Sequence, residues 1–472
     1  MTEIQTIDVA IVGGGFTGAA VAFHLTHFKP TASIAVFEPR DFLGGGLAYD
    51  NTDPSHRINV PAGRMSLIPG DERHFARWLA ETGTNDGDTD VAGRDGFLYP
   101  RRGVFGRYVA SHLDPLIADE RVTHVRAKVV SVEADGRYWK ITAAGGRTFQ
   151  ARIIVLATTH PAPDAPRALT KIVADPRVVA DPTAQDALDG IKSDARVVVI
   201  GTGLTMADLI ASLDRQGHRG PIVAVSRRGL RSRGHPRESA EPFGDFQEPA
   251  SGAAALLRHV RRTIREAEAE GLSWHSVIDA VRRDAQTFWP KLSAGTQSQI
   301  VRHLRVYWDV HRFRIAPQVE DVLERRIADG SLKILSASIV EAGAQASHID
   351  IIARHRKHGS SETLTADHVV VTTGPAHARI LSSQPYLAHL SAEGRITADH
   401  LGLGIACDER SRALDDKRQP AATLLIAGPL ARARFGELMG LPQVSAHALA
   451  VAKEASCYLY AEASAREVVG AD

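Results

Sequence analysis

The sequence has little cysteine, no excess of charge of either sign and no long apolar run. Only two cysteines, Cys407 and Cys457, occur in 472 residues, and their separation fits neither a disulfide framework nor zinc spacing. Formal net charge is +1, so bulk charge indicates neither a nucleic-acid nor a membrane partner. No apolar run approaches the ~20 residues that span a bilayer. With no signal peptide at the start, these absences predict a cytoplasmic protein.

Several catalytic signatures are missing as well. No Cys-x-x-Cys occurs, which excludes the mechanism of thioredoxin and glutathione reductases. Neither Gly-x-Ser-x-Gly nor a Walker A motif occurs, so hydrolase and phosphoryl-transfer functions are not indicated. His355 and His358 lie three residues apart in a polar stretch. That stretch is typical of a surface hairpin, and we predict no metal site.

Glycine, by contrast, stands at informative positions near the start. A strand predicted over Ile7–Val12 leads into Gly13-Gly14-Gly15-Phe16-Thr17-Gly18, and a helix is predicted from about Thr17 to His27. This is the G-x-G-x-x-G fingerprint, in which the glycines allow a tight turn, close approach of a pyrophosphate and close helix packing. Glu38 ends the next strand, 20 residues after Gly18, where a carboxylate would hold ribose hydroxyls. The pattern predicts a site for FAD or NAD.

A second, imperfect copy follows in the middle of the chain. The strand predicted over Arg196–Ile200 leads into Gly201-Thr202-Gly203-Leu204-Thr205, with Met206 in place of the third glycine. The next predicted strand, Pro221–Val225, is followed by Ser226-Arg227-Arg228 instead of an acid. Arginines there would bind the 2′-phosphate of NADPH. A solvated basic loop is the alternative.

Two nucleotide units, with the second inserted into the first, are typical of flavoproteins that bind both FAD and NAD(P)H. Ala157-Thr158-Thr159 and Thr372-Thr373-Gly374 occupy the places of the usual linking turns. We therefore predict an α/β fold with two Rossmann-like dinucleotide-binding domains and a helical insert. The predicted bounds are 1–180 plus 340–472 for the FAD domain and 181–339 for the NADPH domain, with the insert at about 245–330.

The chain resembles the NAD(P)/FAD-binding proteins of the FAD-NAD(P)-binding family, relatives of flavin-containing, N-hydroxylating monooxygenases. The resemblance spans nearly the whole chain. The residues that carry it are Gly44-Gly45-Gly46-Leu47-Ala48-Tyr49, His56-Arg57-Ile58-Asn59-Val60-Pro61-Ala62, Met65-Ser66, Gly201 to Asp208, Trp308-Asp309, His311-Arg312, Arg314, Ala316-Pro317 and Gly428-Pro429.

The resemblance implies roles for individual residues. Asn59 would lie beside the reactive edge of the flavin and is the catalytic candidate, with a turn residue before Pro61 as the alternative. A cluster in the insert consists of Trp308, His311, Arg312 and Arg314. It would recognise an anionic substrate or the cofactor phosphates, and the alternative is that it is only the solvated face of a helix. Pro429 stands where many flavoproteins have a ribityl-binding Asp. The two fingerprints contribute predicted cofactor-binding residues: Gly13, Gly15, Phe16, Thr17, Gly18, Gly201, Gly203, Leu204 and Thr205. The other predicted cofactor-binding residues are Glu38, Pro39, Arg40, Gly46, Leu47, Ala48, Tyr49, Asn59, Val60, Pro61, Ala157, Thr158, Arg227, Arg228, Gly374, Gly428 and Pro429.

These features together predict an FAD-dependent, NADPH-consuming oxidoreductase. The preferred form is a monooxygenase that oxygenates a small nucleophilic substrate through a C4a-hydroperoxyflavin, with N-hydroxylation of an amine as the favoured reaction. Its partners would be that small molecule and molecular oxygen, and the oligomeric state stays open. One alternative is a flavin reductase or oxidase without oxygen insertion. Another is a protein that holds FAD as a redox sensor without turnover.

Overall fold

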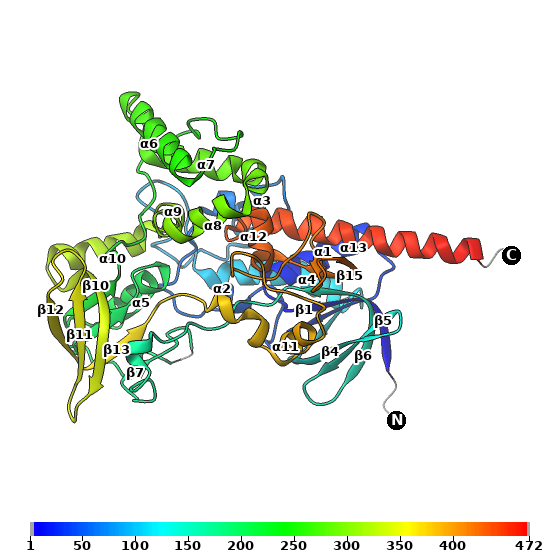
Figure 1. Cartoon of the computed structure of the whole chain (residues 1–472), viewed down its shortest axis with the longest axis horizontal. Helices are drawn as coiled ribbons and strands as arrows, with labels where there is room; N and C mark the ends of the chain where they lie inside the picture. Colours follow the sequence, from blue (N-terminus) through cyan, green and yellow to red (C-terminus); the bar gives the residue numbers. More distant parts are fainter. Residues whose placement is uncertain (1–3, 185, 470–472) are drawn as a thin grey trace.

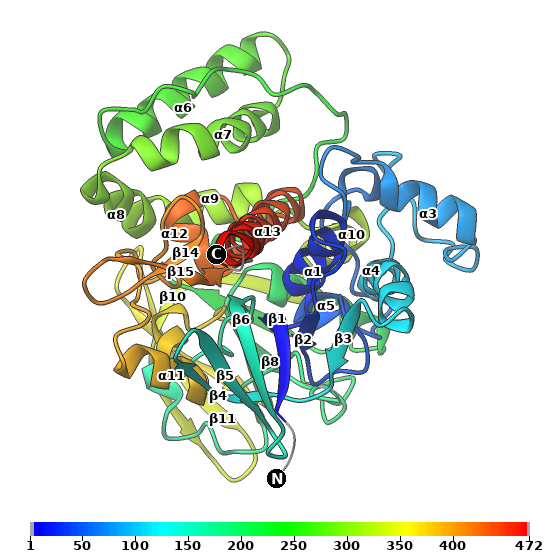
Figure 2. The same cartoon turned by 90° about the vertical axis from the view of Figure 1, so that its right-hand side faces the viewer.

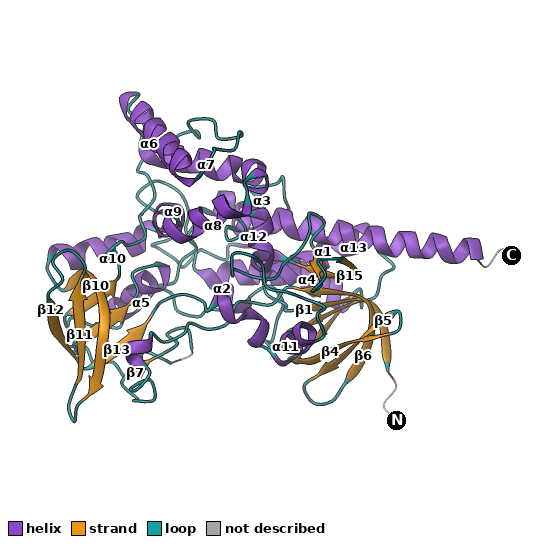
Figure 3. Ribbon diagram, in the orientation of Figure 1, coloured by secondary structure: helices purple, strands orange, loops and turns teal. Residues whose placement is uncertain are grey.

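Two β-sheets lie side by side and carry most of the fold (Figures 1 and 3). The computed structural model describes residues 4–184 and 186–469. The first sheet has the order β14-β15-β6-β1-β2-β3, and β4 and β5 extend it from β6. Its strands are β1 (Gln5–Val12), β2 (Ile34–Phe37), β3 (Val122–Val125), β4 (Val129–Asp135), β5 (Tyr138–Ala143), β6 (Thr148–Leu156), β14 (Arg412–Leu414) and β15 (Pro420–Ile426).

The central strands of the first sheet are parallel, because β1 pairs in parallel with both β2 and β6 and β6 pairs in parallel with β15. Four helices cover or flank them: α1 (Phe16–Phe28), α3 (His74–Thr82), α4 (Arg102–Ala118) and α13 (Leu441–Val469). Helix α13 packs along α1 and runs on past the sheet (Figure 1). Parallel strands with a helix on each crossover form the Rossmann-like arrangement that the first fingerprint predicts.

The second sheet has the order β12-β11-β10-β9-β8-β13-β7. Its strands are β7 (Val178–Val179), β8 (Val197–Ile200), β9 (Ile222–Ser226), β10 (Leu332–Ala344), β11 (Ile349–His355), β12 (Ser361–Ala366) and β13 (His368–Val371). Strands β7 to β10 and β13 are parallel, and β11 and β12 form an antiparallel extension. Helices α5 (Leu204–Arg215) and α10 (Pro317–Ala328) pack together beside this sheet.

A helical insert lies above the two sheets, and its helices α6 and α7 stand away from both of them in Figures 1 and 2. It contains α6 (Ala253–Ala269), α7 (Trp274–Phe288), α8 (Ala294–His303) and α9 (Arg305–Arg312). Its own apolar core includes Phe246, Val277, Phe288 and Trp289. The shorter helices α2 (Gly46–Tyr49), α11 (Pro385–Ala392) and α12 (Arg432–Phe435) lie in the connections. The α/β fold class with a helical insert is therefore confirmed.

The chain returns to the first sheet later than the sequence predicts. The predicted return is at residue 340, but the strands between that residue and Val371 pair within the second sheet. The cause is β10, a single 13-residue strand that pairs in parallel with β9 over its first half and antiparallel with β11 over its second half. The chain leaves the first sheet after β6 and returns to it after β13.

Candidate active site

Most of the predicted cofactor-binding residues follow the carboxyl ends of parallel strands. Gly13 follows β1, Glu38 follows β2, Ala157 follows β6 and Gly428 follows β15, all at one edge of the first sheet. In the same way Gly201, Arg227 and Thr372 follow β8, β9 and β13 at one edge of the second sheet. Ligands of open α/β sheets bind at this edge.

The first glycine loop is closely packed. Gly13 has φ +101°, and a Cβ there would lie 2.7 Å from the carbonyl oxygen of Ala157. A Cβ at Gly18 would collide with the carbonyl oxygen of Gly13. Gly15 caps α1 in an extended conformation, and no side chain caps the helix. The N-terminus of α1 is thus left for an anionic ligand, as a pyrophosphate site requires.

A second glycine loop meets the first. Gly44 N–H donates to the carbonyl oxygen of Gly14 at 2.8 Å. A Cβ at Gly46 would lie 2.8 Å from the Cα of Gly15, so the second loop needs glycine where it touches the first. Leu47 beside them is 51% exposed, an unusual position for a large apolar side chain. The two loops therefore leave an apolar surface next to the N-terminus of α1.

Glu38 holds the first loop in place. Its Oε2 accepts from Gly14 N–H at 3.0 Å, and its Oε1 accepts from the backbone N–H and Nη1 of Arg40 at 3.1 and 3.0 Å. The carboxylate is 4% exposed. A carboxylate has about four acceptor positions, so one remains for a ribose hydroxyl. Binding of ribose by Glu38, and of cofactor by the exposed Pro39, stays a prediction.

The second fingerprint repeats the design of the first. Gly201 has φ +125°, and a Cβ there would collide with the carbonyl oxygen of Thr372. Gly203 caps α5, and a Cβ at Gly203 would meet open space. Each predicted linking turn thus packs against the first glycine of one fingerprint: Ala157 against Gly13, and Thr372 against Gly201.

The basic loop after β9 is open to a ligand. Arg227 and Arg228 are exposed. The guanidinium of Arg228 lies 4.9 Å from the ring centre of Tyr307 on α9. Within the described part of the chain, no carboxylate forms an ion pair with Arg227 or Arg228, whereas Arg231 of the same loop lies 3.8 Å from Glu324.

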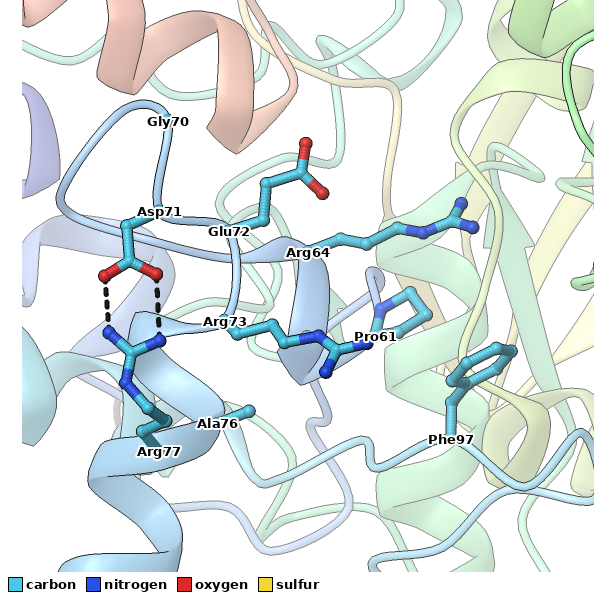
Figure 4. A pocket seen from close by; sticks show the side chains of 10 residues that line it. Pro61, Arg64, Gly70, Asp71, Glu72, Arg73, Ala76, Arg77 and Phe97 are labelled. Carbon is cyan, nitrogen blue, oxygen red and sulfur yellow. Dashed lines mark hydrogen bonds and ion pairs between the residues drawn. The ribbon is translucent and has the colours of Figure 1, made fainter.

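Asn59 lies at the boundary between the first sheet's connections and the insert. Its carbonyl oxygen accepts from His235 Nε2 at 3.0 Å, and its side chain is partly exposed. Pro61, two residues on, lines an open cavity of about 750 Å³ (Figure 4). In that cavity Arg77 is paired with Asp71, and Arg64 and Arg73 extend across the opening (Figure 4). The catalytic role of Asn59 stays a prediction.

The structure brings only two of the four predicted substrate residues together: the ring of His311 and the guanidinium of Arg314 lie 4.8 and 5.8 Å from the ring centre of Trp274. Arg312 is ion-paired with buried Glu437 at 3.0 Å, and Arg314 is ion-paired with Asp279 at 2.9 Å. Both charges are therefore already neutralised inside the protein. His311 Nδ1 donates to the carbonyl oxygen of Tyr307 on its own helix at 2.7 Å, and Trp308 packs against the core of the insert.

The Gly428-Pro429 turn is fixed by a histidine that the sequence did not single out. Gly428 N–H donates to His447 Nδ1 at 3.0 Å, and His447 Nε2 donates to Ser411 Oγ at 3.0 Å. Burial lowers the pKa of His447 to about 4, which keeps the acceptor nitrogen unprotonated. The Gly428 N–H is therefore already used, and cofactor binding by Gly428 and Pro429 stays a prediction.

A group of unpartnered polar side chains was also missed by the sequence reasoning. His160 follows the first linking turn and His377 follows the second, and their rings lie 4.3 Å apart. Neither ring nitrogen of His160 has a hydrogen-bond partner among the described residues. No shared spacing marks them in the sequence, because His160 directly follows Ala157-Thr158-Thr159, whereas His377 lies three residues after Thr372-Thr373-Gly374.

Comparisons with known proteins agree with this geometry. Residues 10–161 match the FAD-NAD(P)-binding family. This match confirms the predicted resemblance over that segment. No protein with a curated description matches the chain in sequence.

Solved structures share the fold over nearly the whole chain. An ornithine N-hydroxylase from Kutzneria sp. 744, solved with reduced FAD, NADP⁺ and L-ornithine, has a TM-score of 0.65 at 18% identity and covers 96% of this chain and 100% of its own. An ornithine hydroxylase from Pseudomonas aeruginosa has a TM-score of 0.62 at 16% identity, with the same coverage. A bacillithiol disulfide reductase from Bacillus cereus has a TM-score of 0.50 at 15% identity, again with 96% and 100% covered. These likenesses confirm the two-unit flavoenzyme fold.

The described residues form neither a metal site nor a membrane-spanning helix. Within residues 4–184 and 186–469, no three His, Cys, Asp or Glu side chains gather as a metal site needs. Of the helices that the structure describes, none combines the length and apolarity that crossing a membrane takes.

Proposed function

We propose that the protein is an FAD-dependent oxidoreductase that consumes NADPH. The observation that carries this proposal is the repetition of one local design: a glycine loop at the carboxyl edge of a parallel sheet, an uncapped helix N-terminus, and a linking turn packed against the first glycine. Each sheet has its own copy. A bound FAD would supply the redox chemistry, and the protein supplies position and electrostatics.

FAD fits the first sheet and NADPH fits the second. The Gly13–Gly18 loop, Glu38 and helix α2 would hold the adenosine diphosphate part of FAD, since they leave both a helix N-terminus and an apolar surface. Gly203 and the N-terminus of α5 would hold the pyrophosphate of NADPH. Exposed Arg227 and Arg228 would hold its 2′-phosphate.

The reaction that we propose is N-hydroxylation of a small amine with molecular oxygen. Two structural relatives that cover 96% of the chain are ornithine hydroxylases, and no Cys-x-x-Cys is present for dithiol chemistry. Because cysteine is scarce and no helix among those described crosses a membrane, we propose the cytoplasm as the compartment.

A reductase or oxidase is the second candidate, because a bacillithiol disulfide reductase shares the fold. In that case hydride would pass from NADPH through FAD to an acceptor without oxygen insertion. The protein's task would then be to hold the acceptor, whereas a monooxygenase must exclude water around the reacting flavin.

The two candidates are separated by isotope labelling. A panel of diamines and amino acids is incubated with the protein, NADPH and isotopically labelled molecular oxygen, and the masses of the products are measured by mass spectrometry. The proposed reaction predicts that one amine gains a labelled oxygen atom while hydrogen peroxide falls. Release of all consumed oxygen as peroxide with every amine supports the reductase or oxidase.

A further inference from the structure

A hydrogen bond joins the connection after β9 to the segment Asn59–Pro61. His235 Nε2 donates to the carbonyl oxygen of Asn59 at 3.0 Å, although the two residues lie 176 positions apart in the sequence. His235 belongs to the connection between β9 and α6, and Arg227 and Arg228 stand at the start of that same connection. The bond therefore runs from the second unit to the first.

The backbone around Asn59 depends on this bond. On either side of it, Ile58 N–H and Ala62 N–H each donate at 2.9 Å to carbonyl oxygens of the stretch Leu98–Pro100. Between those two anchors, no other hydrogen bond from the described part of the chain reaches Asn59 or Val60. Without its donor, this piece of backbone would be tied only at its two ends.

The ring that supplies the donor is held by its own neighbours. Tyr99 is fully buried, and its ring centre lies 5.3 Å from that of His235. The carbonyl oxygen of Gly234 accepts from His275 Nε2 at 3.2 Å, which fixes the backbone just before the ring. Pro236 follows and restricts the backbone of His235 to an extended conformation. A side chain whose orientation is fixed by packing and by neighbouring hydrogen bonds holds its contact precisely.

The protonation of His235 suits this contact. Burial, with the nearby charge of Arg314, lowers the pKa of His235 to about 4, so the ring is neutral near pH 7. A carbonyl oxygen can only accept, and the single ring proton is therefore on Nε2.

The segment Asn59–Pro61 stands between two cavities. Pro61 lines both the cavity of about 750 Å³ in Figure 4 and a smaller one of about 30 Å³. His235 and Tyr99 line the smaller cavity. In the proposed reaction, hydride passes from NADPH on the second sheet to FAD on the first, so the reacting groups have to meet between the two units. The bond from His235 to Asn59 crosses that boundary.

We propose that His235 is a positioning residue for flavin reduction: its Nε2–H fixes the segment Asn59–Pro61 where the two cofactors meet. This inference rests on the proposed function and deepens it. His235 acts through Asn59 and is separate from the nucleotide-phosphate sites, so it sets the rate of hydride transfer and leaves the affinity for NADPH unchanged. Misplacing reacting groups by about 1 Å can cost up to a hundredfold in rate.

The test separates the N–H group of His235 from its ring. His235→Phe keeps a ring against Tyr99 but has no donor, whereas His235→Gln loses the ring and keeps an N–H group near the position of Nε2. His303→Phe is the control, because His303 is an exposed histidine at the end of α8. If His235→Phe does not fold, the smaller His235→Leu takes its place.

The flavin-loaded proteins are mixed rapidly with a series of NADPH concentrations without oxygen, and the visible absorbance of flavin is followed. We expect the limiting rate of flavin reduction to fall about tenfold or more in His235→Phe. The NADPH concentration that gives half of that rate should not change. His235→Gln should recover most of the rate, and His303→Phe should match the natural protein.

The absorbance of the oxidised flavin before mixing gives a second readout. It should shift in His235→Phe and return in His235→Gln, because the segment beside the flavin moves only when the donor is lost. A lower thermal midpoint in His235→Phe with an unchanged limiting rate and spectrum would show a merely structural role and would overturn the proposal.

Three other results would also overturn it. Equal loss of rate in His235→Phe and His235→Gln would mean that ring packing matters and the hydrogen bond does not. A higher NADPH requirement with an unchanged limiting rate would place His235 in the NADPH site. A natural protein that binds no flavin, or whose flavin NADPH does not reduce, would contradict the proposed function and this inference with it. Normal reduction of the natural protein, matched by His235→Phe, would contradict this inference alone.

Discussion

Gly15 occupies the closest approach between the two glycine loops. A Cβ at Gly15 would lie 3.4 Å from the Cα of Gly46, so a branched side chain would fill the space between the loops and cover the N-terminus of α1. We expect Gly15→Val to yield folded protein without flavin, which the visible absorbance of the purified protein will report. The control is Gly190→Val, where a Cβ meets open space and φ is not positive. Full flavin content in Gly15→Val would mean that FAD binds elsewhere.

Arg227 and Arg228 test which nicotinamide nucleotide is used. Each charge-assisted hydrogen bond to a 2′-phosphate contributes about 1.5–3 kcal/mol, less where it is exposed. Replacing both arginines with alanine should raise the KM for NADPH roughly 10- to 100-fold and leave the KM for NADH nearly unchanged. The kcat should change little, because the phosphate is bound equally in the ground and transition states. Arg262→Ala, on an exposed face of α6, is the control.

Equal use of NADH and NADPH by the natural protein would contradict this assignment. The loop from Ser226 to Arg237 would then be a solvated basic loop, the alternative that the sequence leaves open.

His447 makes stability depend on pH. Its pKa is lowered by burial to about 4 in the folded protein, against about 6.5 in the unfolded chain. The stabilisation from the neutral ring is therefore complete above pH 6.5 and is lost as pH falls toward 4, by roughly 3 kcal/mol in all. His447→Asn keeps an acceptor for Gly428 N–H but does not titrate, so unfolding by urea should show a shallower loss of free energy between pH 6.5 and 4.

The control for that prediction is His389→Asn, because His389 is an exposed histidine on α11. It should follow the natural protein at every pH. An unchanged pH slope in His447→Asn would mean that other buried groups account for the acid sensitivity.

At the scale of elements, α5 joins the second sheet to the first. Asp208 on α5 is ion-paired with Arg102 of α4 at 2.8 Å. His56 Nε2 donates to Ser212 Oγ, also on α5, at 3.0 Å. These contacts cross between the units that carry the two fingerprints. We therefore expect them to set how a nucleotide bound at α5 would face one bound at α1.

Asp208→Asn should disturb that alignment without removing either nucleotide site. Misplacing reacting groups by about 1 Å can cost up to a hundredfold in rate, so we expect slower reduction of flavin by NADPH, by about tenfold or more, with flavin content unchanged. Asp214→Asn is the matched control, because Asp214 lies on the same helix but pairs with Arg325 of α10. Equal reduction rates in both variants, measured by rapid mixing without oxygen, would contradict an aligning role for this contact.

Helices and strands with a clear periodicity of apolar residues could be predicted from the sequence. Features that depend on which strands pair with each other could not. The strand–helix–strand units at Ile7–Phe37 and Arg196–Val225 follow from apolar strands, glycine turns and amphipathic spacing, and the structure has them within a few residues. Helix α4 was not predicted: it contains Gly106 and Pro115, which usually break helices. The change of pairing along β10 depends on which strand lies opposite, and local sequence does not encode that.

At the scale of the whole molecule, the glycine loops were predictable because each lies within one short segment. The contact between His160 and His377 was not, because it joins the two crossings between the sheets, which lie far apart in the sequence. The same reason explains why Arg312 and Arg314 look like free cations in the sequence. Their counter-ions Glu437 and Asp279 lie 125 and 35 residues away.

The central claim is that FAD on the first sheet is reduced by NADPH on the second. The most direct measurement is an oxygen-free titration of the purified protein with NADPH, followed by the visible absorbance of flavin. We expect a yellow protein with one FAD per chain, whose colour is bleached by one NADPH per flavin and returns when oxygen is admitted. A protein that binds no flavin, or that holds flavin unreduced by an excess of NADPH, would contradict it.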